Sequence, residues 1–538
     1  MAMACVASRD SLSSLGRLTA LTSPTSSSDL WTRRFFGLLG AVFVFRLLFM
    51  LFFTSQADLA GDEAYYWDWG RRPDWGYFSK PPMIGWLMGA IGWLTGNAEW
   101  GVRLAPLLFG TATLAVLFTL TRKLFNAGTG FLVALLILAT PANIGMNLFF
   151  TIDAPLLLFW SLSLLLFWLA AEKPSCLWRW LGLTLAIGLG TLSKQMMLAF
   201  PAMMVIFAAV SKEDRALLKN PRLWVTILLG TAFITPVLWW NTKHQWITLE
   251  HTKHHFETHS LSVGKWLERT LEYPAVQALV YSPITYAALL VVVFLAFKHW
   301  RSLDRRARYL LLCSGPALVA FFGLSLRQKI NPNWPAVFYV PAFILLAAWV
   351  QGGLPFAAKP FWKTWSLRVG GALVVIAHLF LLVVFLTDLK GHKKLNEMRG
   401  WTETGIQAGK FLDQVPRPEH TFVMTTGYRY DAAQLAFTMP QHPQLYRWER
   451  SGKVLSQYEV WPGPEERLGD DALIFKNGGD KPGEIFAGVA KHFESIERLG
   501  RVEVNLGKDN TRAYDVFLGR KLLSWDKPGV SQPAKPTP

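Results

Sequence analysis

The chain has 538 residues, of which 52% are hydrophobic and 17% charged, and it carries a formal net charge of +17. This composition, with 25 Trp and 37 Phe, argues against a set of water-soluble domains and favours a multi-span membrane protein. The basic residues lie mostly in short clusters between apolar runs, and no nucleic-acid-binding motif is apparent, so the charge indicates membrane topology and no nucleic-acid partner.

Residues 1–30 are rich in Ser and Thr and poor in acids. They lack the compact apolar segment and the small-residue cleavage site of a signal peptide. We expect them to form a disordered cytoplasmic tail, followed by an uncleaved first span.

Apolar runs of about 20 residues, the length that crosses a bilayer core, recur through residues 31–388. They lie near residues 35–53, 102–121, 129–147, 154–171, 180–193, 198–210, 223–240, 282–297, 309–326, 334–350 and 367–387. The sequence therefore predicts an α-helical polytopic membrane domain of about 11 spans. The fifth and sixth runs are short, so half-spans and a tight hairpin both fit them.

Lys and Arg concentrate in alternate loops, beginning with Arg33 and Arg34 before the first span. The later basic loops lie at residues 122–123, 173–179, 212–222, 298–308 and 359–363. Basic loops of membrane proteins stay in the cytoplasm. We therefore expect the amino terminus inside. An odd number of spans then puts the carboxyl-terminal region outside, together with the loop after the first span.

Two adjacent carboxylates, Asp62 and Glu63, stand in this first outer loop among aromatic residues. Carboxylates at a membrane boundary are costly to desolvate, and by default they indicate function. Solvated acids in an interfacial loop would explain the same pattern. Farther along the loop, residues 83–94 are an apolar run too short to cross a bilayer, which predicts a helix lying in the outer interface.

Other polar side chains gather on the outer side under this topology. Asp153 lies at a turn between two spans, where it is a candidate catalytic acid and also a candidate helix N-cap ahead of Pro155. The outer cations are Lys80, Lys194, Arg327 and Lys329. One such cation can simply extend to the lipid headgroups. Several that converge near two acids indicate an anionic substrate.

Histidines cluster in the outer segment at residues 241–281. His251, His254 and His255 have helical spacings that suit metal ligands, but no His-Glu-x-x-His pattern is present. A solvated interfacial helix explains the same spacing. The three cysteines imply neither a thiol metal site nor a disulfide framework.

After residue 388 the chain becomes polar and its periodicity is mixed. Helices are expected at residues 401–415, 431–437 and 484–496, and strands at 420–426, 471–475, 502–506 and 513–518. We predict a small extracytoplasmic α/β domain at residues 389–525 and a disordered tail at 526–538.

Four motifs carry a family resemblance. They are Gly-Asp-Glu-Ala-Tyr-Tyr-Trp at residues 61–67, Lys-Pro-Pro at 80–82, Thr-Ile-Asp-Ala-Pro at 151–155 and Asn-Pro-Asn-Trp-Pro at 331–335. In this order between spans, they make residues 35–387 resemble the bacterial branch of glycosyltransferase family 39. That branch is related to protein O-mannosyltransferases and to the aminoarabinose transferases that modify lipid A.

The resemblance implies a membrane-embedded GT-C fold in a bacterial inner membrane. Such enzymes take a sugar from a polyprenyl phosphate and transfer it, with inversion, to an acceptor outside the cytoplasm. The acceptor can be lipid A, another envelope glycan or a protein. The family's acidic positions match Asp62 and Asp153, and Glu63 can exchange roles with its neighbour. The aminoarabinose transferases have a carboxylate before the lysine, where this chain has Ser79, which argues against a metal site that uses this carboxylate. No cofactor is certain, and a divalent metal stays open.

The expected chemistry needs a base, a phosphate site and an apolar groove. Asp62 is the expected base. Lys80, Lys194, Arg327 and Lys329 are the candidates for the donor phosphate. A transporter or flippase of lipid-linked sugars is the alternative, and it would need the cations but no base at the outer face.

Overall fold

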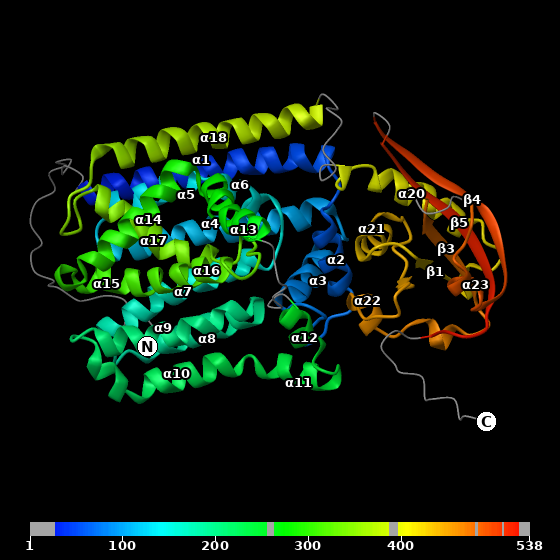
Figure 1. Ribbon diagram of the computed structural model, residues 1–538, viewed down its shortest axis with the longest axis horizontal. Helices are drawn as coiled ribbons and strands as arrows, with labels where there is room; N and C mark the ends of the chain where they lie inside the picture. The colour runs from blue at the N-terminus through cyan, green and yellow to red at the C-terminus, as the bar shows by residue number, and fades with distance from the viewer. Residues whose placement is uncertain (1–26, 255–262, 387–395, 479–482, 508–509, 527–538) are drawn as a thin grey trace, which may run out of the picture.

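The computed structural model describes residues 27–254, 263–386, 396–478, 483–507 and 510–526. It divides into a helical bundle and a carboxyl-terminal part built around a sheet. The long helices of the bundle run along the long axis of the molecule, and the sheet lies beyond one end of them (Figure 1). We refer to that end as the outer end.

The bundle contains both long and short helices. They are α1 (Ser27–Gln56), α4 (Glu99–Leu124), α5 (Ala127–Leu138), α7 (Asp153–Glu172), α8 (Leu177–Ser193), α9 (Ala199–Val210), α10 (Pro221–Ala232), α11 (Thr235–Lys243), α14 (Pro283–Lys298), α15 (Arg305–Leu312), α16 (Gly315–Ser325), α17 (Ala336–Val350) and α18 (Pro360–Leu386). Five further helices lie toward the outer end. They are α2 (Gly61–Gly70), α3 (Met83–Thr95), α6 (Pro141–Leu148), α12 (Ile247–His254) and α13 (Val263–Tyr281).

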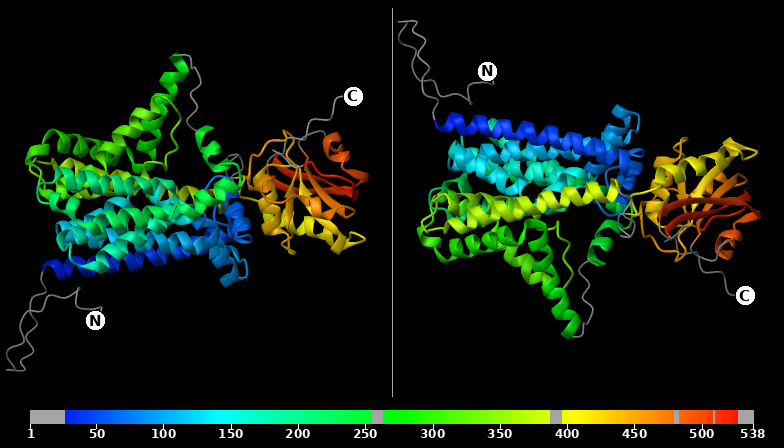
Figure 2. Two further views of the ribbon diagram at one scale, coloured as in Figure 1. Left: turned by 90° about the horizontal axis from the view of Figure 1, so that it is seen from below. Right: turned by 90° about the horizontal axis from the view of Figure 1, so that it is seen from above.

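Within the described residues, six helices are long and apolar enough to cross a membrane, or up to eight if two bent pairs each count as one span. The chain is therefore a multi-span helical membrane protein, but the predicted count of about 11 spans is not confirmed. The bent pairs are α5 with α6, at 79°, and α13 with α14, at 110°. Both breaks have a proline at the start of the second helix, where its missing N–H costs nothing. Figure 2 shows α13 leaning out from the side of the bundle.

The helices sort by how much of each one is buried. From Ala336 to Trp349, every residue of α17 is buried, which makes this short helix the centre of the bundle. By contrast, α1 and α18 lie side by side on the outside, and most of their apolar side chains are exposed or half-buried. A helix that is apolar all round and buried belongs to a core, whereas exposed apolar surface on α1 and α18 suits lipid.

One charged residue faces the inside of the bundle from a lipid-exposed helix. The Arg46 guanidinium on α1 donates a hydrogen bond of 2.8 Å to Asn147 and a second bond to Asn143. Both amides belong to α6, the second half of the first bent pair. A charge at this depth is costly unless protein groups satisfy it. These bonds therefore fix α6, which forms one wall of the site described below.

The carboxyl-terminal part holds a five-stranded mixed sheet. Its strands are β1 (Thr421–Thr425), β2 (Leu445–Arg447), β3 (Asp471–Asn477), β4 (Phe493–Gly507) and β5 (Asn510–Leu522), in the order β2-β1-β3-β5-β4. Strand β1 is parallel to β2 and β3, and β5 is antiparallel to β3 and β4. The helices of this part are α20 (Trp401–Asp413), α21 (Arg429–Thr438), α22 (Gln457–Val460) and α23 (Ala487–Ala490).

Most elements predicted for this part are confirmed, including α20, α21, β1 and β3. The helix predicted at residues 484–496 is wrong, because only α23 is helical there and β4 already begins at Phe493. The end of this segment is covered by hydrogen bonds to β5, so sheet pairing decides its conformation. The short strand β2 and the single-turn α22 were not predicted.

The first outer segment folds into two helices that pack closely. A Cβ atom added to Gly70 of α2 would lie 2.3 Å from the backbone nitrogen of Gly89 on α3. Because backbone atoms on both sides cannot move away, this contact admits only glycine. The apolar run predicted at residues 83–94 is confirmed as a helix, α3, whose side chains Trp93 and Leu94 are exposed.

We predict that Gly70→Ala separates α2 from α3 and destabilises the protein by about 1–3 kcal/mol, the usual cost of overpacking. Thermal unfolding in detergent, followed by tryptophan fluorescence, measures the effect. Gly40→Ala on α1 is the matched control, since a Cβ there meets nothing within 4 Å. Equal melting temperatures for the two variants would contradict the close contact.

Candidate active site

Helix α2 carries the two acids singled out in the sequence, and its first turn holds them on different sides. Glu63 is fully buried, and its two carboxylate oxygens accept 2.9 Å hydrogen bonds from the backbone N–H groups of Ala60 and Phe150. Burial raises the pKa of Glu63, while the Arg103 guanidinium and both N–H donors oppose that rise. Glu63 therefore ties α2 to the segment before α7, and it does not line the cavity described next.

Asp62, the preceding residue, lines an open cavity of about 490 Å³ at the outer end of the bundle. One carboxylate oxygen, Oδ1, accepts a 2.7 Å hydrogen bond from the Tyr430 hydroxyl of α21. Acids in the first turn of a helix also lie near the positive end of its dipole. The carboxylate is thus held at one oxygen while its side chain borders the cavity.

The cavity collects segments that are far apart in the sequence. Its wall includes the polar side chains of Asp62, Tyr66, Lys80, Asp153, Lys194, Tyr281, Asn331 and Asn333. Apolar residues of α6 and of the α6–α7 connection also line it. All four motifs of the family resemblance therefore contribute residues to one cavity, and the Lys-Pro-Pro motif does so through Lys80.

Asp153 forms the most constrained cluster in this wall. Its Oδ1 accepts a 2.8 Å bond from the Lys194 ammonium, and its Oδ2 accepts a 2.6 Å bond from the Asn333 side-chain amide. The predicted N-cap role is wrong: α7 begins at Asp153 itself, and the side chain of the capping position makes no bond to the helix. The carboxylate instead joins three elements of the cavity wall.

Lys80 is the cation in this wall that has no partner. No hydrogen bond or ion pair joins its ammonium group to any residue in the described part of the chain. Burial lowers the pKa of Lys80, and the nearby Lys194 ammonium lowers it further, while Asp62 and Asp153 oppose this. An anion that entered the cavity would relieve both unfavourable effects.

The structure places the two remaining candidate cations elsewhere. Arg327 and Lys329 are exposed and do not line the cavity. Lys329 forms a 2.5 Å ion pair with Glu272 of α13. Of the four cations predicted to bind a phosphate, the tertiary structure therefore brings Lys80 and Lys194 together.

The histidine cluster does not assemble into a metal site in the described residues, where no group of three potential ligands occurs. His251 of α12 packs its ring against Phe78, with 4.7 Å between ring centres. His254 ends α12, and His255 lies outside the described residues. The cavity wall supplies one paired carboxylate, Asp153, and one that bonds a tyrosine, Asp62. This donor set fits a metal poorly.

A second, apolar cavity of about 90 Å³ adjoins the first, and Ala142, Met146 and Tyr281 line both. Side chains of α4, α6, α7 and α17 form the rest of its wall. A polar cavity with an unpaired cation therefore lies beside an apolar space between helices. This combination suits an amphiphile with an anionic head and a hydrocarbon chain.

Sequence reasoning missed several residues of the site. Tyr66 and Asn333 lie in two of the family motifs but had no assigned role. Tyr281 was not singled out. Tyr430 is 368 positions from Asp62, and no local pattern connects the two residues. Only homologous sequences or the fold itself could have identified it.

Comparison with known proteins identifies the family of the chain. Residues 79–240 match the family model of dolichyl-phosphate-mannose-protein mannosyltransferases. The chain is 32% identical over 418 residues to lipid A galacturonosyltransferase RgtD of Rhizobium johnstonii, which covers 75% of this chain and 83% of that protein. It is 25% identical to an undecaprenyl phosphate-4-amino-4-deoxy-L-arabinose arabinosyl transferase of Pectobacterium carotovorum, over 58% of each chain.

The fold leads to the same group of proteins. The structure of ArnT from Cupriavidus metallidurans bound to undecaprenyl phosphate superposes with a TM-score of 0.58 at 18% identity, over 91% of this chain and 98% of that one. At this identity the likeness concerns the fold alone. The relative matched over 83% of its length shows that the chain belongs to the bacterial branch of glycosyltransferase family 39, and the likeness in fold agrees. The protein is therefore an integral-membrane glycosyltransferase with a GT-C fold.

Proposed function

We propose that the protein transfers a sugar from a polyprenyl-phosphate donor to a hydroxyl group of an envelope lipid of the lipid A class. The reaction takes place at the outer face of a bacterial inner membrane. The observation that carries the proposal is the single cavity in which an unpaired Lys80 and the Asp62 carboxylate face the same space. The relatives named above support the donor and the acceptor class.

In the proposed step, the Asp62 carboxylate accepts the proton of the acceptor hydroxyl as its oxygen attacks the anomeric carbon of the sugar. The bond between that carbon and the donor phosphate oxygen breaks, and the polyprenyl phosphate leaves with the electron pair. A single displacement inverts the anomeric configuration. Positioned bases contribute about 10²–10⁴-fold to such proton transfers.

The leaving phosphate gains negative charge during this step. Among the residues that the structure describes, Lys80 forms no ion pair, and it can hold that charge from the start of the reaction. Lys194 contributes a second cation, partly neutralised by Asp153. Fixed and partly buried charges stabilise a developing anion more strongly than fully solvated ones do. The adjoining apolar cavity gives the first isoprene units a place between the helices.

The proposal is tested with purified protein in detergent, a polyprenyl-phosphate sugar and a lipid A acceptor. We expect release of polyprenyl phosphate together with a mass increase of the acceptor by one sugar residue. A protein that moves the lipid across vesicle membranes and leaves the donor chemically intact is a flippase, and that outcome would overturn the proposal.

We predict that Asp62→Asn lowers turnover about 10²–10⁴-fold, because the amide cannot take the proton. Its melting temperature should stay close to that of the wild type. Glu63→Gln should lower the melting temperature and reduce turnover less than Asp62→Asn does. The reason is that its amide nitrogen would face a backbone N–H donor in a buried place. Turnover and thermal unfolding of both variants separate the two roles. A well-folded Asp62→Asn enzyme with normal turnover would refute the assignment.

For the phosphate site, we predict that Lys80→Gln weakens binding of polyprenyl phosphate, because the cavity loses its unpaired cation. Fluorescence titration in detergent measures the affinity. Lys329→Gln is the matched control, because Lys329 is exposed and paired with Glu272. Since burial lowers the pKa of Lys80, wild-type affinity should fall at a lower pH than for an ordinary lysine. Equal losses in both variants would place the phosphate elsewhere.

We further propose that the amino terminus is cytoplasmic and the carboxyl-terminal part lies outside, as the basic loops indicate. Exposed Ser451 is on the proposed outer side and exposed Ser175 on the inner side. In a background with Cys5 replaced by Ser, Ser451→Cys should react with a membrane-impermeant maleimide in spheroplasts, whereas Ser175→Cys should react only after lysis. The opposite pattern would reverse the topology.

A further inference from the structure

The carboxyl-terminal part contacts the α2 helix that carries the proposed base. The Tyr65 hydroxyl accepts a 2.5 Å hydrogen bond from the backbone N–H of Gln457, and the Tyr458 hydroxyl donates a 2.7 Å bond to Asp68. The Gln434 amide donates a 2.6 Å bond to the carbonyl oxygen of Leu59, just before α2. Bonds therefore reach α2 along its length from α21 and α22.

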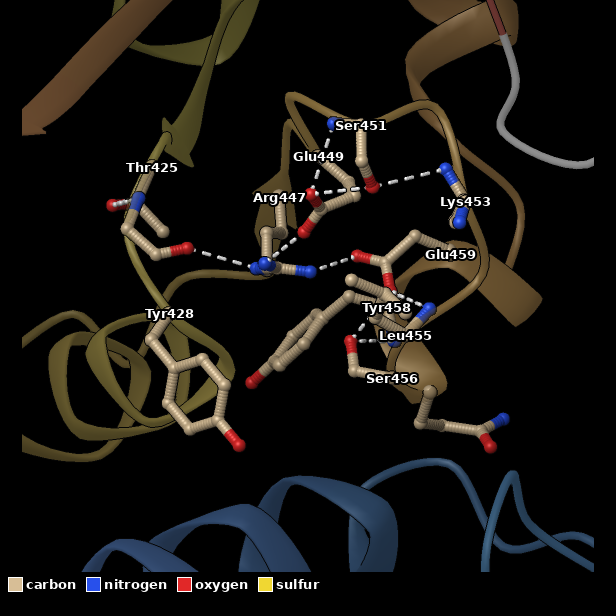
Figure 3. A network of polar contacts seen from close by, with 12 residues as sticks. Thr425, Tyr428, Arg447, Glu449, Ser451, Lys453, Leu455, Ser456, Tyr458 and Glu459 are labelled. Carbon is tan, nitrogen blue, oxygen red and sulfur yellow. Dashed lines mark hydrogen bonds and ion pairs between the residues drawn. The ribbon is translucent and has the colours of Figure 1, made fainter. Parts of the chain in front are cut away.

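A buried ion-pair network supports the α22 side of this contact. The Arg447 guanidinium of β2 forms a 2.6 Å ion pair with Glu459 of α22 and a second pair with Glu449. Glu459 also accepts a 2.8 Å bond from the Ser456 hydroxyl. Figure 3 shows this network around Arg447, with Tyr458 pointing away from it toward the blue ribbon below. Through Arg447, the sheet thus holds in place the helix α22, whose residues contact α2.

One contact of this interface reaches the proposed base itself. Tyr430, the second residue of α21, donates its hydroxyl hydrogen to Asp62 Oδ1 at 2.7 Å. The Arg429 guanidinium donates a 3.3 Å bond to the same hydroxyl oxygen. Burial raises the pKa of Tyr430, and the Asp62 charge raises it further. The hydroxyl therefore keeps its proton and stays a donor at neutral pH.

Packing holds the Tyr430 ring in this place. A Cβ atom on Gly61 would lie 2.5 Å from Cγ of the Tyr430 ring, so the ring occupies the space that a side chain at Gly61 would need. The residue before the proposed base and the tyrosine that bonds to it are therefore fitted to one another. This packing is independent of the hydrogen bond.

The bond has a specific consequence for a base that shares a cavity with a lysine. Asp62 and Lys80 line the same cavity and interact electrostatically. A carboxylate that moved onto the ammonium would neutralise the phosphate-binding cation and lose its own capacity to take a proton. Fixing Oδ1 on the Tyr430 hydroxyl opposes this movement and leaves Oδ2 as the oxygen for the acceptor.

We propose that Tyr430 is a positioning residue supplied to the active site by the carboxyl-terminal part, which orients Asp62 toward the acceptor and keeps it apart from Lys80. This inference rests on the proposed function, in which Asp62 is the base. It gives the carboxyl-terminal part a role in the chemical step. The hydroxyl of Tyr430 acts through Asp62 and exchanges no proton with the substrate.

The test compares Tyr430→Phe with Tyr428→Phe in the full-length protein. Tyr428 is an exposed neighbour, and no hydrogen bond of its hydroxyl occurs in the described structure, so the same change there is the matched control. We expect Tyr430→Phe to lower kcat roughly 10- to 100-fold, the effect of losing a hydrogen bond to a charged group. The donor KM should stay unchanged.

The pH profile provides a readout that a merely structural role would not move. The acidic limb of the kcat profile should shift to higher pH in Tyr430→Phe, because the ionised Asp62 carboxylate loses a stabilising donor. Gly61→Ala should reproduce both effects with the hydroxyl intact, since its Cβ displaces the ring. Tyr428→Phe should match the wild type.

Two outcomes would overturn the inference. In one, Tyr430→Phe keeps the kcat and the pH profile of Tyr428→Phe. In the other, its loss of activity follows a lower melting temperature with an unshifted profile. Both differ from failure of the proposed function, in which the wild-type enzyme itself does not release polyprenyl phosphate.

Discussion

Glu63 places a carboxylate where no water reaches it, and the outer end of the bundle is arranged around satisfying that charge. An unpaired buried carboxylate is very costly, so its two oxygens each require a donor. The donors are the backbone N–H groups of Ala60 and Phe150, which belong to segments on either side of the cavity. Through Glu63, α2 and the segment before α7 keep a fixed distance. Asp62 directly precedes Glu63, and Asp153 follows Phe150 by three residues.

The charges in the cavity wall are unequal in a way that matters for an anionic ligand. Asp153 is fully engaged by Lys194 and Asn333, which makes it a structural support of the wall as well as a nearby charge. Lys80 is left without a protein partner in the described structure. A cavity that keeps one cation unpaired at an apolar boundary retains a site for an anionic ligand. Complete internal pairing would have removed that site.

The broken helices explain how a membrane bundle can contain such a cavity. At the α5–α6 break the chain turns by 79°, and α6 then forms a wall shared by the polar and the apolar cavity. Irregular backbone at membrane depth is tolerated where protein buries it or where it borders a cavity. Arg46 of α1 holds α6 in place beside this break by bonding to two of its side-chain amides.

The sequence by itself determined the features that depend on local pattern. Apolar runs predicted the membrane class, α3 and most elements of the carboxyl-terminal part, and the acidic and basic motifs named Asp62, Asp153, Lys80 and Lys194. The tertiary structure decided the rest. It set the number of helices long enough to span, because the helices over the runs at 198–210 and 334–350 are too short and the run at 129–147 bends at Pro141. It turned the segment after residue 492 into a strand, since β5 supplies its hydrogen bonds. It also separated Glu63 from the cavity and joined Tyr430 to Asp62, because burial and contact between distant residues depend on packing, which no short stretch of sequence encodes.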